Sequence, residues 1–219
     1  MRFAPEGWPF IGLGWALVAA AIWATLRWGG GGLPWVAVGV LTLIGIWLFI
    51  FFRDPLRPGP RGDALVIAPA DGRIVSVVAT DEPSYLHAPA TRISIFMNVF
   101  DVHVNRYPVS GTVEYRHYNP GKFLHAATDK ASLDNEQSSI GVRGPHGPVL
   151  VRQIAGQIAR RIVTDGEVGA RATQGERLGM IRFGSRVDVY IPSAERPAVQ
   201  VKVGETVSAG VTVLARYPQ

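Results

Sequence analysis

A serine directly after a glycine, near the C-terminus, is the side chain of this sequence best suited to covalent chemistry. Gly184-Ser185 precedes the alternating segment Val187–Ile191, which is typical of a β-strand. A serine hydroxyl at a strained, desolvated site can attack the carbonyl carbon of the preceding residue and move the acyl group from nitrogen to oxygen. β-Elimination of that ester leaves dehydroalanine, which loses ammonia to give a pyruvoyl ketone. Most Gly-Ser pairs are turns, so the dipeptide alone is weak evidence for this chemistry.

Two further polar side chains are suited to proton transfer. His103 alternates with Val102 and Val104 in a strand-like run, and imidazole titrates near neutral pH. A buried histidine that only makes hydrogen bonds in the core is the alternative interpretation. Asp71 offers a carboxylate before Gly72, where an Asx-turn is the simpler interpretation.

Composition limits the classes of function. The chain has 219 residues and no cysteine, which excludes disulfides, thiolate catalysis and cysteine metal sites. The histidines lack metal-ligand spacing, so no metal is expected. The formal net charge of +5 suits an anionic membrane surface, and no nucleic-acid motif accompanies it. We therefore expect a membrane partner and no nucleic-acid partner.

The N-terminal quarter predicts a membrane element. Phe10–Leu26 and Leu33–Phe52 are uncharged apolar runs, each near the length needed to cross a hydrocarbon core of about 30 Å. Three arginines follow the second run, at positions 53, 57 and 61. The positive-inside rule therefore predicts a hairpin over residues 1–56 in the cell (inner) membrane, with the following domain on the cytoplasmic side. A hairpin that enters only one leaflet is the alternative.

Residues 57–62 form a linker rich in proline and glycine, and residues 63–219 form the second domain. Short strands are predicted at Ala64–Ala68, Arg73–Ala79, Arg92–Asn98, Gly111–Tyr118, Val149–Ile154 and Val187–Ile191. The predicted class is therefore mainly β. A helix is also suggested over Gln153–Val163, where Ile154, Ile158 and Ile162 recur with helical spacing.

Two segments of this domain look like the halves of a biotinyl/lipoyl-type β-sandwich. They are Ala68–Ile74 and Val201–Val211, in which glycine turns join short strands. The expected fold is therefore a lipoyl-like sandwich core with additional strands, preceded by the helical hairpin.

Four blocks of the sequence together resemble phosphatidylserine decarboxylase, in its short bacterial and archaeal branch. The blocks are Ala68–Gly72, Asp101–Gly111, Asn135-Glu136 and Arg182–Asp188, and they follow the order of the family. Three positions depart from the pattern of longer members. Arg186 follows the serine in place of threonine, Arg106 replaces a second histidine, and Gln137 replaces an arginine.

The resemblance implies a membrane-bound, self-processing proenzyme that forms phosphatidylethanolamine and CO2 from phosphatidylserine. Cleavage between Gly184 and Ser185 would give a β chain of residues 1–184 and an α chain of residues 185–219. The cofactor would be the pyruvoyl group made from Ser185, which forms a Schiff base with the substrate, without metal or pyridoxal phosphate. Asp71 would act in cleavage, and His103 in cleavage or in protonation of Cα. Arg106 cannot act as a base, and is a candidate to bind a carboxylate or lipid phosphate.

Two alternatives remain at this stage. Thr128–Ala131 resembles the turn that receives lipoate, so the chain could be a membrane-anchored carrier or adaptor modified on Lys130. Lys130 lies far from both half-motifs, which favours instead a loop residue or a contact to lipid phosphate. The second alternative is a pyruvoyl decarboxylase that acts on a different amino-acid headgroup.

Overall fold

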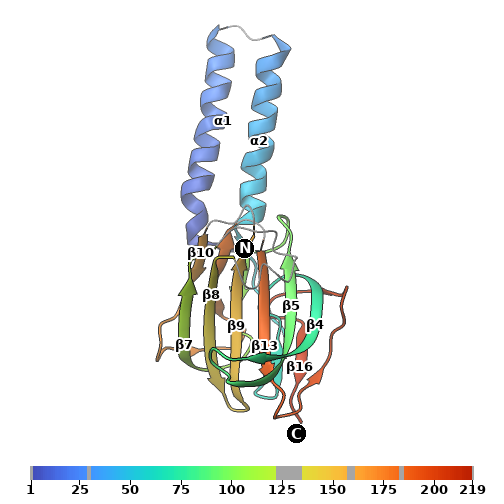
Figure 1. Cartoon of the computed structure of the whole chain (residues 1–219). Helices are drawn as coiled ribbons and strands as arrows, with labels where there is room; N and C mark the ends of the chain where they lie inside the picture. Colours follow the sequence, from blue (N-terminus) through green and yellow to red (C-terminus); the bar gives the residue numbers. More distant parts are fainter. Residues whose placement is uncertain (1, 29–30, 122–134, 157–160, 183–184, 219) are drawn as a thin grey trace. The chain divides into compact units, whose positions relative to one another are not determined.

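The computed structural model describes residues 2–28, 31–121, 135–156, 161–182 and 185–218. The chain divides into two compact units, Met1–Leu56 and Arg57–Gln219. Each unit has its own secondary structure, helical in the first and β in the second (Figure 1).

The first unit is a pair of long apolar helices. The 3-10 turn η1 (Pro5–Gly7) leads into α1 (Trp8–Trp28), and α2 (Gly32–Phe51) returns. A short ladder between β1 (Arg2–Phe3) and β2 (Arg53–Asp54) joins the two ends of the unit. Glycines let the helices approach closely, because a Cβ at Gly14 would lie 2.9 Å from Leu48 Cδ1.

Most of the apolar surface of this hairpin is exposed. Large hydrophobic residues that are more than half exposed are Trp8, Leu13, Trp23, Leu26, Trp28, Leu33, Val36, Val40 and Leu43. By length and composition, Pro5–Trp28 with 24 residues and Gly32–Phe51 with 20 residues could each cross a membrane. The prediction of two long apolar helices is confirmed.

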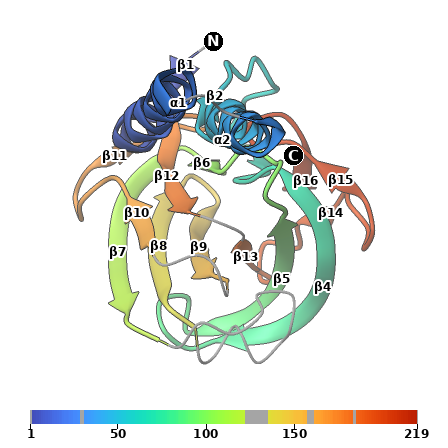
Figure 2. The same cartoon turned by 90° about the horizontal axis from the view of Figure 1, so that it is seen from above.

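The second unit contains an eight-stranded antiparallel sheet in the order β11-β7-β8-β9-β13-β5-β4-β15. The strands are β4 (Gly72–Glu82), β5 (Ala88–Met97), β7 (Gly111–Asn119), β8 (Gln137–Gly144), β9 (Gly147–Ala155), β11 (Arg171–Ala172), β13 (Ser185–Pro192) and β15 (Thr206–Val207). The sheet curls, so that β7 and β4 come round on opposite sides of it (Figure 2).

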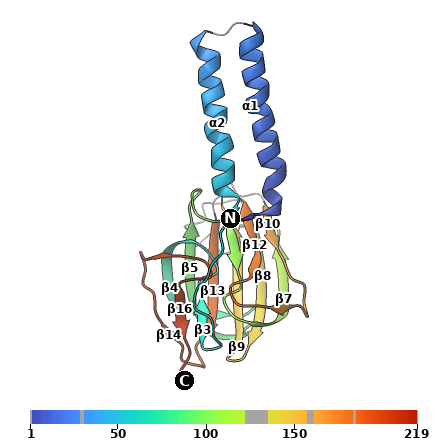
Figure 3. The ribbon, with the colours of Figure 1, turned by 180° about the vertical axis from the view of Figure 1, so that it is seen from behind.

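Two three-stranded sheets complete the unit. One has the order β10-β12-β6, with β6 (Val104–Arg106), β10 (Arg161–Thr164) and β12 (Arg177–Arg182). The other has the order β14-β16-β3, with β3 (Leu65–Ile67), β14 (Ala198–Val199) and β16 (Val213–Arg216). From behind, β3, β14 and β16 are seen together, as are β10 and β12 (Figure 3).

Alternation along the central strands produces the core. Ile93, Ile95, Val151, Val187 and Val189 are all fully buried in one apolar cluster. Because successive strand residues point to opposite faces, these side chains share one face of the large sheet. The prediction of a mainly β class is confirmed.

The prediction of a helix over residues 153–163 is wrong. Strand β9 continues through Ala155, and β10 occupies Arg161–Thr164, while residues 157–160 lie outside the described part. Ile154 pairs with Arg186 of β13, and Ile162 pairs with Ile181 of β12. Cross-strand pairing therefore overrides the helical spacing of the isoleucines.

The lipoyl-like resemblance stays a prediction. Its two segments do pair, since Thr206 and Val207 of β15 lie opposite Arg73 and Gly72 of β4. That pairing sits at one edge of the eight-stranded sheet.

Candidate active site

Ser185 is the first residue of β13, near the centre of the eight-stranded sheet. It pairs with Met97 of β5 on one side and with Ala155 of β9 on the other. Its side chain is fully buried. The preceding strand, β12, ends at Arg182 in a different sheet, so the chain changes sheets just before Ser185. Gly184, the other side of the predicted cleavage bond, lies outside the described residues.

The Ser185 hydroxyl contacts a thioether. Ser185 Oγ donates to Met97 Sδ at 3.3 Å. The same sulfur accepts from Asn105 Nδ2 at 3.7 Å. Asn105 belongs to β6 and is fully buried, so an amide from the small sheet meets a serine from the large one at a single sulfur atom.

A hydrogen-bonded chain continues from Asn105 through the core. Gln153 Nε2 donates to Asn105 Oδ1 at 2.8 Å, and Thr164 Oγ1 donates to Gln153 Oε1 at 2.7 Å. Ser138 Oγ lies 2.6 Å from Thr164 Oγ1. These residues come from β6, β9, β10 and β8, so the chain crosses between the two sheets.

His103 is fully buried immediately before β6. Its Nδ1 lies 3.0 Å from the carbonyl oxygen of Asp101. A carbonyl oxygen only accepts, so in the neutral ring Nδ1 carries the proton and Nε2 carries the lone pair. The carbonyl of His103 in turn accepts from the backbone N–H of Ile181 in β12. The ring therefore has a fixed tautomer with Nε2 as its basic atom.

Asp71 lies directly before β4. Its Oδ2 accepts from Arg57 Nη2 at 2.5 Å, and its Oδ1 accepts from the backbone N–H of Ala209 at 2.7 Å. Arg73, two residues on, pairs with Phe96 of β5, next to the residue that pairs with Ser185. Asp71 thus precedes β4 at the end of the strand that is near Ser185, with β5 between β4 and β13. Its described hydrogen bonds go to Arg57 of the linker and to Ala209.

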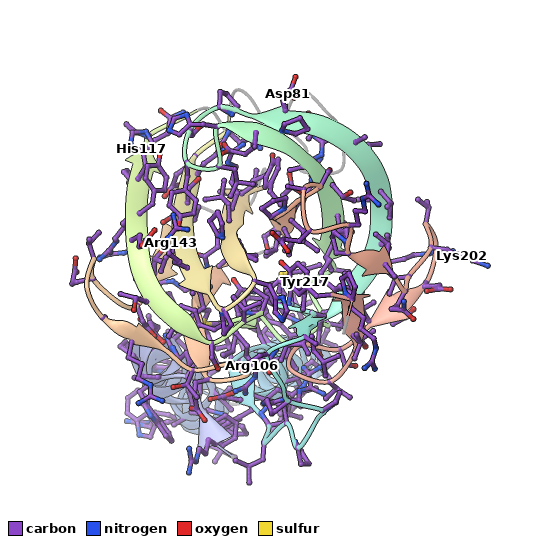
Figure 4. The ribbon with its side chains drawn as sticks, turned by 90° about the horizontal axis from the view of Figure 1, so that it is seen from below. Asp81, Arg106, His117, Arg143, Lys202 and Tyr217 are labelled. Atoms are coloured by element: carbon purple, nitrogen blue, oxygen red, sulfur yellow. The ribbon has the colours of Figure 1, made fainter. Side chains whose placement is uncertain are left out.

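The described hydrogen bonds of Arg106, the next candidate, go to residues other than Ser185. Arg106 is buried, and its Nη1 donates to the carbonyl of Gly175 at 3.0 Å. Its backbone N–H donates to the Pro69 carbonyl, which joins two of the sequence blocks. Figure 4 shows Arg106 and Tyr217 among the packed elements, whereas Lys202 projects from the periphery. Lys130 lies outside the described residues.

The Asn135-Glu136 block reaches Ser185 through strand β9. Asn135 Nδ2 donates to the Ala155 carbonyl at 2.7 Å, and the Ala155 N–H donates to the Glu136 carbonyl at 3.0 Å. Ala155 is the cross-strand partner of Ser185. Tyr118 Oη donates to Glu136 Oε1, and burial together with this carboxylate raises the pKa of Tyr118. The phenol therefore stays a donor at neutral pH.

Comparison with known proteins gives the family. A family model described as phosphatidylserine decarboxylase matches residues 44–215. The phosphatidylserine decarboxylase proenzyme of Symbiobacterium thermophilum is 46% identical over 217 residues, covering 99% of this chain and 96% of the relative. A protein of the same name from Aromatoleum aromaticum is 46% identical over 216 residues, covering 98% and 95%. The chain belongs to the phosphatidylserine decarboxylase family. The resemblance inferred from the sequence blocks is thus confirmed.

Sequence reasoning missed three residues of this candidate site, namely Met97, Asn105 and Gln153. Asn105 lies inside a block that carries the resemblance, but its neighbours His103 and Arg106 have titratable or charged side chains. Gln153 also had a signal, because it is a polar residue at a position of β9 that faces the apolar core. A buried amide at such a position needs partners, and these were not visible along the chain.

Proposed function

We propose that the protein is a membrane-bound, pyruvoyl-dependent phosphatidylserine decarboxylase that makes phosphatidylethanolamine and CO2, and that it matures by cleaving itself between Gly184 and Ser185. The observation that carries this is the position of Ser185, buried at the start of a central strand where separate sequence blocks converge. Family membership supplies the substrate class.

Self-cleavage needs only the chain's own atoms and water. Ser185 Oγ bonds to the Gly184 carbonyl carbon, the C–N bond breaks, and the hydroxyl proton passes to the amine nitrogen. Loss of the Ser185 Cα proton then breaks the Cβ–Oγ bond, which frees the Gly184 carboxylate and leaves dehydroalanine. Hydrolysis releases ammonia and leaves a ketone at residue 185. A buried serine beside a thioether rather than a charged group fits this product.

The pyruvoyl group would supply the electron sink for the carbanion that loss of CO2 creates. His103, once protonated at Nε2, would pass that proton to the substrate Cα, because the ring is buried and its Nδ1–H is held by the Asp101 carbonyl. Asp71 would serve the cleavage step, with its carboxylate oriented by Arg57 and Ala209.

The cleaved chains would stay together. The α chain, residues 185–219, contains β13, which has partner strands on both sides, and β15, which pairs with β4. The exposed apolar helices would hold the protein in the cell (inner) membrane, where a lipid substrate is presented, with the β-domain on the cytoplasmic side.

Intact-mass measurement tests the cleavage. Purified wild-type protein should give two chains that meet at Gly184 and Ser185, with the α chain blocked by pyruvoyl, and it should release CO2 from phosphatidylserine. Ser185→Ala should remain one chain and inactive because it lacks the nucleophile. Ser193→Ala, which follows β13, is the matched control and should cleave normally. An active wild-type protein in one continuous chain would contradict the proposal.

The proposed roles of Asp71 and His103 can be distinguished because self-cleavage precedes decarboxylation. Asp71→Ala should leave uncleaved precursor on a denaturing gel. His103→Ala should cleave, but release CO2 at least about a hundredfold more slowly, the lower range for general acid–base catalysis. His117→Ala, on the exposed part of β7, should match the wild type. Normal turnover by a cleaved His103→Ala enzyme would return His103 to a structural role.

Membrane attachment has its own test. Detergent should be required to extract the full chain, because the exposed apolar helices would be in contact with lipid. Release by high salt or alkaline carbonate alone would indicate attachment by charge, which salt screens.

A further inference from the structure

Met97 sulfur joins the reacting serine to a buried amide, and its chemistry fixes how that amide points. A thioether can accept hydrogen bonds and cannot donate them. The sulfur therefore accepts both of its described hydrogen bonds, from the Ser185 hydroxyl at 3.3 Å and from the Asn105 amide at 3.7 Å. Asn105 must turn its NH2 group toward the sulfur and its oxygen away from it.

That orientation propagates through the whole polar chain. With Asn105 Oδ1 turned away from sulfur, Gln153 must donate to it, so Gln153 Oε1 faces Thr164. Thr164 has one hydroxyl hydrogen, and it is used in the hydrogen bond to Gln153 Oε1. Ser138 must then donate to Thr164, at 2.6 Å. All four links agree in direction, which is what a fully satisfied buried network requires.

The chain ends at the atom that must react. Ser185 donates a hydrogen bond to a weak acceptor, the Met97 sulfur. This contact selects one orientation of the hydroxyl hydrogen, in which the oxygen lone pairs point away from the sulfur. The position of the sulfur depends in turn on Asn105. Attack on a neighbouring carbonyl depends steeply on such placement, since an error of about 1 Å can lower a rate about a hundredfold.

We propose that Asn105, oriented by Gln153, is a positioning residue for self-cleavage at Ser185. It acts through Met97, whose sulfur it holds against the serine hydroxyl. The role rests on the proposed self-processing function and adds to it a residue pair outside the Asp71 and His103 assignments.

Three variants test the chain at different links. Asn105→Asp keeps the shape and the acceptor for Gln153 but removes the N–H that meets sulfur. Gln153→Glu keeps the acceptor for Thr164 but removes the donor to Asn105. Met97→Leu keeps nearly the same volume without a sulfur acceptor. Ser193→Ala, outside this hydrogen-bonded chain, is the control.

The measurement is the cleavage rate of full-length precursor made by cell-free translation into vesicles, followed on a denaturing gel. Protease resistance in the same samples gives the folded fraction, and rates are expressed per folded precursor. We expect Asn105→Asp to cleave about a hundredfold more slowly than wild type at pH 8, the scale of a misplaced reacting group. Gln153→Glu and Met97→Leu should also be slowed, and Ser193→Ala should stay close to wild type.

Acidification supplies a readout that a purely structural role would not move. A carboxyl group introduced at position 105 is desolvated, which raises its pKa and favours protonation as the pH falls. The neutral acid has an O–H that can donate to Met97, so the rate per folded Asn105→Asp precursor should recover toward wild type. Asn105→Leu, which has no titrating group, should show no such recovery.

The outcomes are distinct. A wild-type chain that does not cleave would overturn the proposed function itself. Wild-type cleavage with an equal rate in folded Asn105→Asp would overturn only the role of Asn105, and so would equal slowing in Ser193→Ala. Where Asn105→Asp does not fold, the volume-conserving Met97→Leu decides, because an unchanged rate there would remove the sulfur contact from the mechanism.

Discussion

The two faces of strand β13 carry opposite chemistry although their residues alternate along one chain. One face bears Ser185 followed by Val187, Val189 and Ile191, all fully buried, the three aliphatic residues in the apolar core. The other bears Arg186, Asp188 and Tyr190, which are also buried. Ser185, the predicted reacting residue, lies on the face that is otherwise apolar. The charged residues lie on the opposite face.

The charged face is closely paired. Arg186 Nε and Nη2 donate to the two carboxylate oxygens of Asp188 at 2.6 and 2.9 Å, and Nη2 also donates to Ser94 Oγ at 3.0 Å. Arg152 of β9 donates to Tyr190 Oη at 3.0 Å and to Glu82 Oε1 at 3.1 Å. The bond to Ser94 connects β13 to β5, the bond to Tyr190 connects it to β9, and Arg152 also connects β9 to β4.

Cross-strand hydrogen bonds on the charged face would keep Ser185 on the apolar side. A slip of one residue would exchange the two faces of the strand and put Ser185 on the charged side. The apolar face could tolerate small shifts, because hydrophobic contacts are not directional. The bonds from Arg186 to Ser94 and from Arg152 to Tyr190 could not, since they join particular atoms of neighbouring strands. These bonds of the charged face therefore favour a single register.

Breaking the buried pair should have the largest effect. Asp188→Ala leaves a buried guanidinium without its carboxylate, which should lower the free energy of unfolding by about 3–5 kcal/mol. Urea unfolding in detergent, on a Ser185→Ala background that keeps one chain, measures this. The double variant Arg186→Met/Asp188→Leu should regain most of the loss, because it removes both charges. Equal stability of the single and double variants would show that the unpaired buried guanidinium is not the cause of the loss.

The second effect concerns Glu82 and depends on pH. Burial alone would raise the pKa of Glu82, but backbone N–H bonds from Leu86, Tyr85 and Ser84 outweigh it and lower the pKa. A lowered folded pKa gives stability that is present above the unfolded value, about 4.3, and is lost as pH falls through the folded value.

Glu82→Gln should therefore lower the free energy of unfolding by about 1–3 kcal/mol at pH 7, the range for a broken buried charged hydrogen bond. The difference from the parent should shrink as urea midpoints are measured from pH 5 downward. A difference that stays constant down to pH 3 would contradict the assignment. Asp81→Asn, at the exposed neighbouring position, is the control.

The smallest effect belongs to the apolar face. Ile191→Val removes one buried methylene and should lower the free energy of unfolding by about 0.5–1.5 kcal/mol, without changing cleavage at Ser185. The same urea assay and a denaturing gel measure both quantities. A clear slowing of cleavage would mean that the apolar face also contributes to register.

Local pattern was sufficient for β13 and for the apolar helices, and it failed where pairing decides. The alternation after Ser185 and the long uncharged runs are visible along the chain. Over residues 153–163, the isoleucine spacing favoured a helix, but the backbone of Ile154 is committed to its neighbours in the large sheet. Short strands such as β6 and β10 carry too few residues for a pattern.

The candidate site could be predicted only where the type of a single residue and its sequence neighbours indicate the chemistry. Ser185 follows a glycine, and His103 and Asp71 stand in the blocks of the family. The chain from Ser138 to Asn105 was not predictable, because its members come from four strands in two sheets and meet only after folding. The spacing of residues along the sequence does not predict that the Asn105 amide will contact the Met97 sulfur.

With the proposed self-cleavage, the placement of β13 between β5 and β9 would make maturation a one-way step in folding. Before cleavage, β13 is covalently joined to β12, which ends only a few residues earlier in the sequence. In the mature form, a separate α chain would have to find the same gap without a tether and without the serine that began the process. The uncleaved precursor would then be the form in which β13 is placed in the sheet. We expect mature protein, once denatured, not to recover, and separately expressed halves not to assemble.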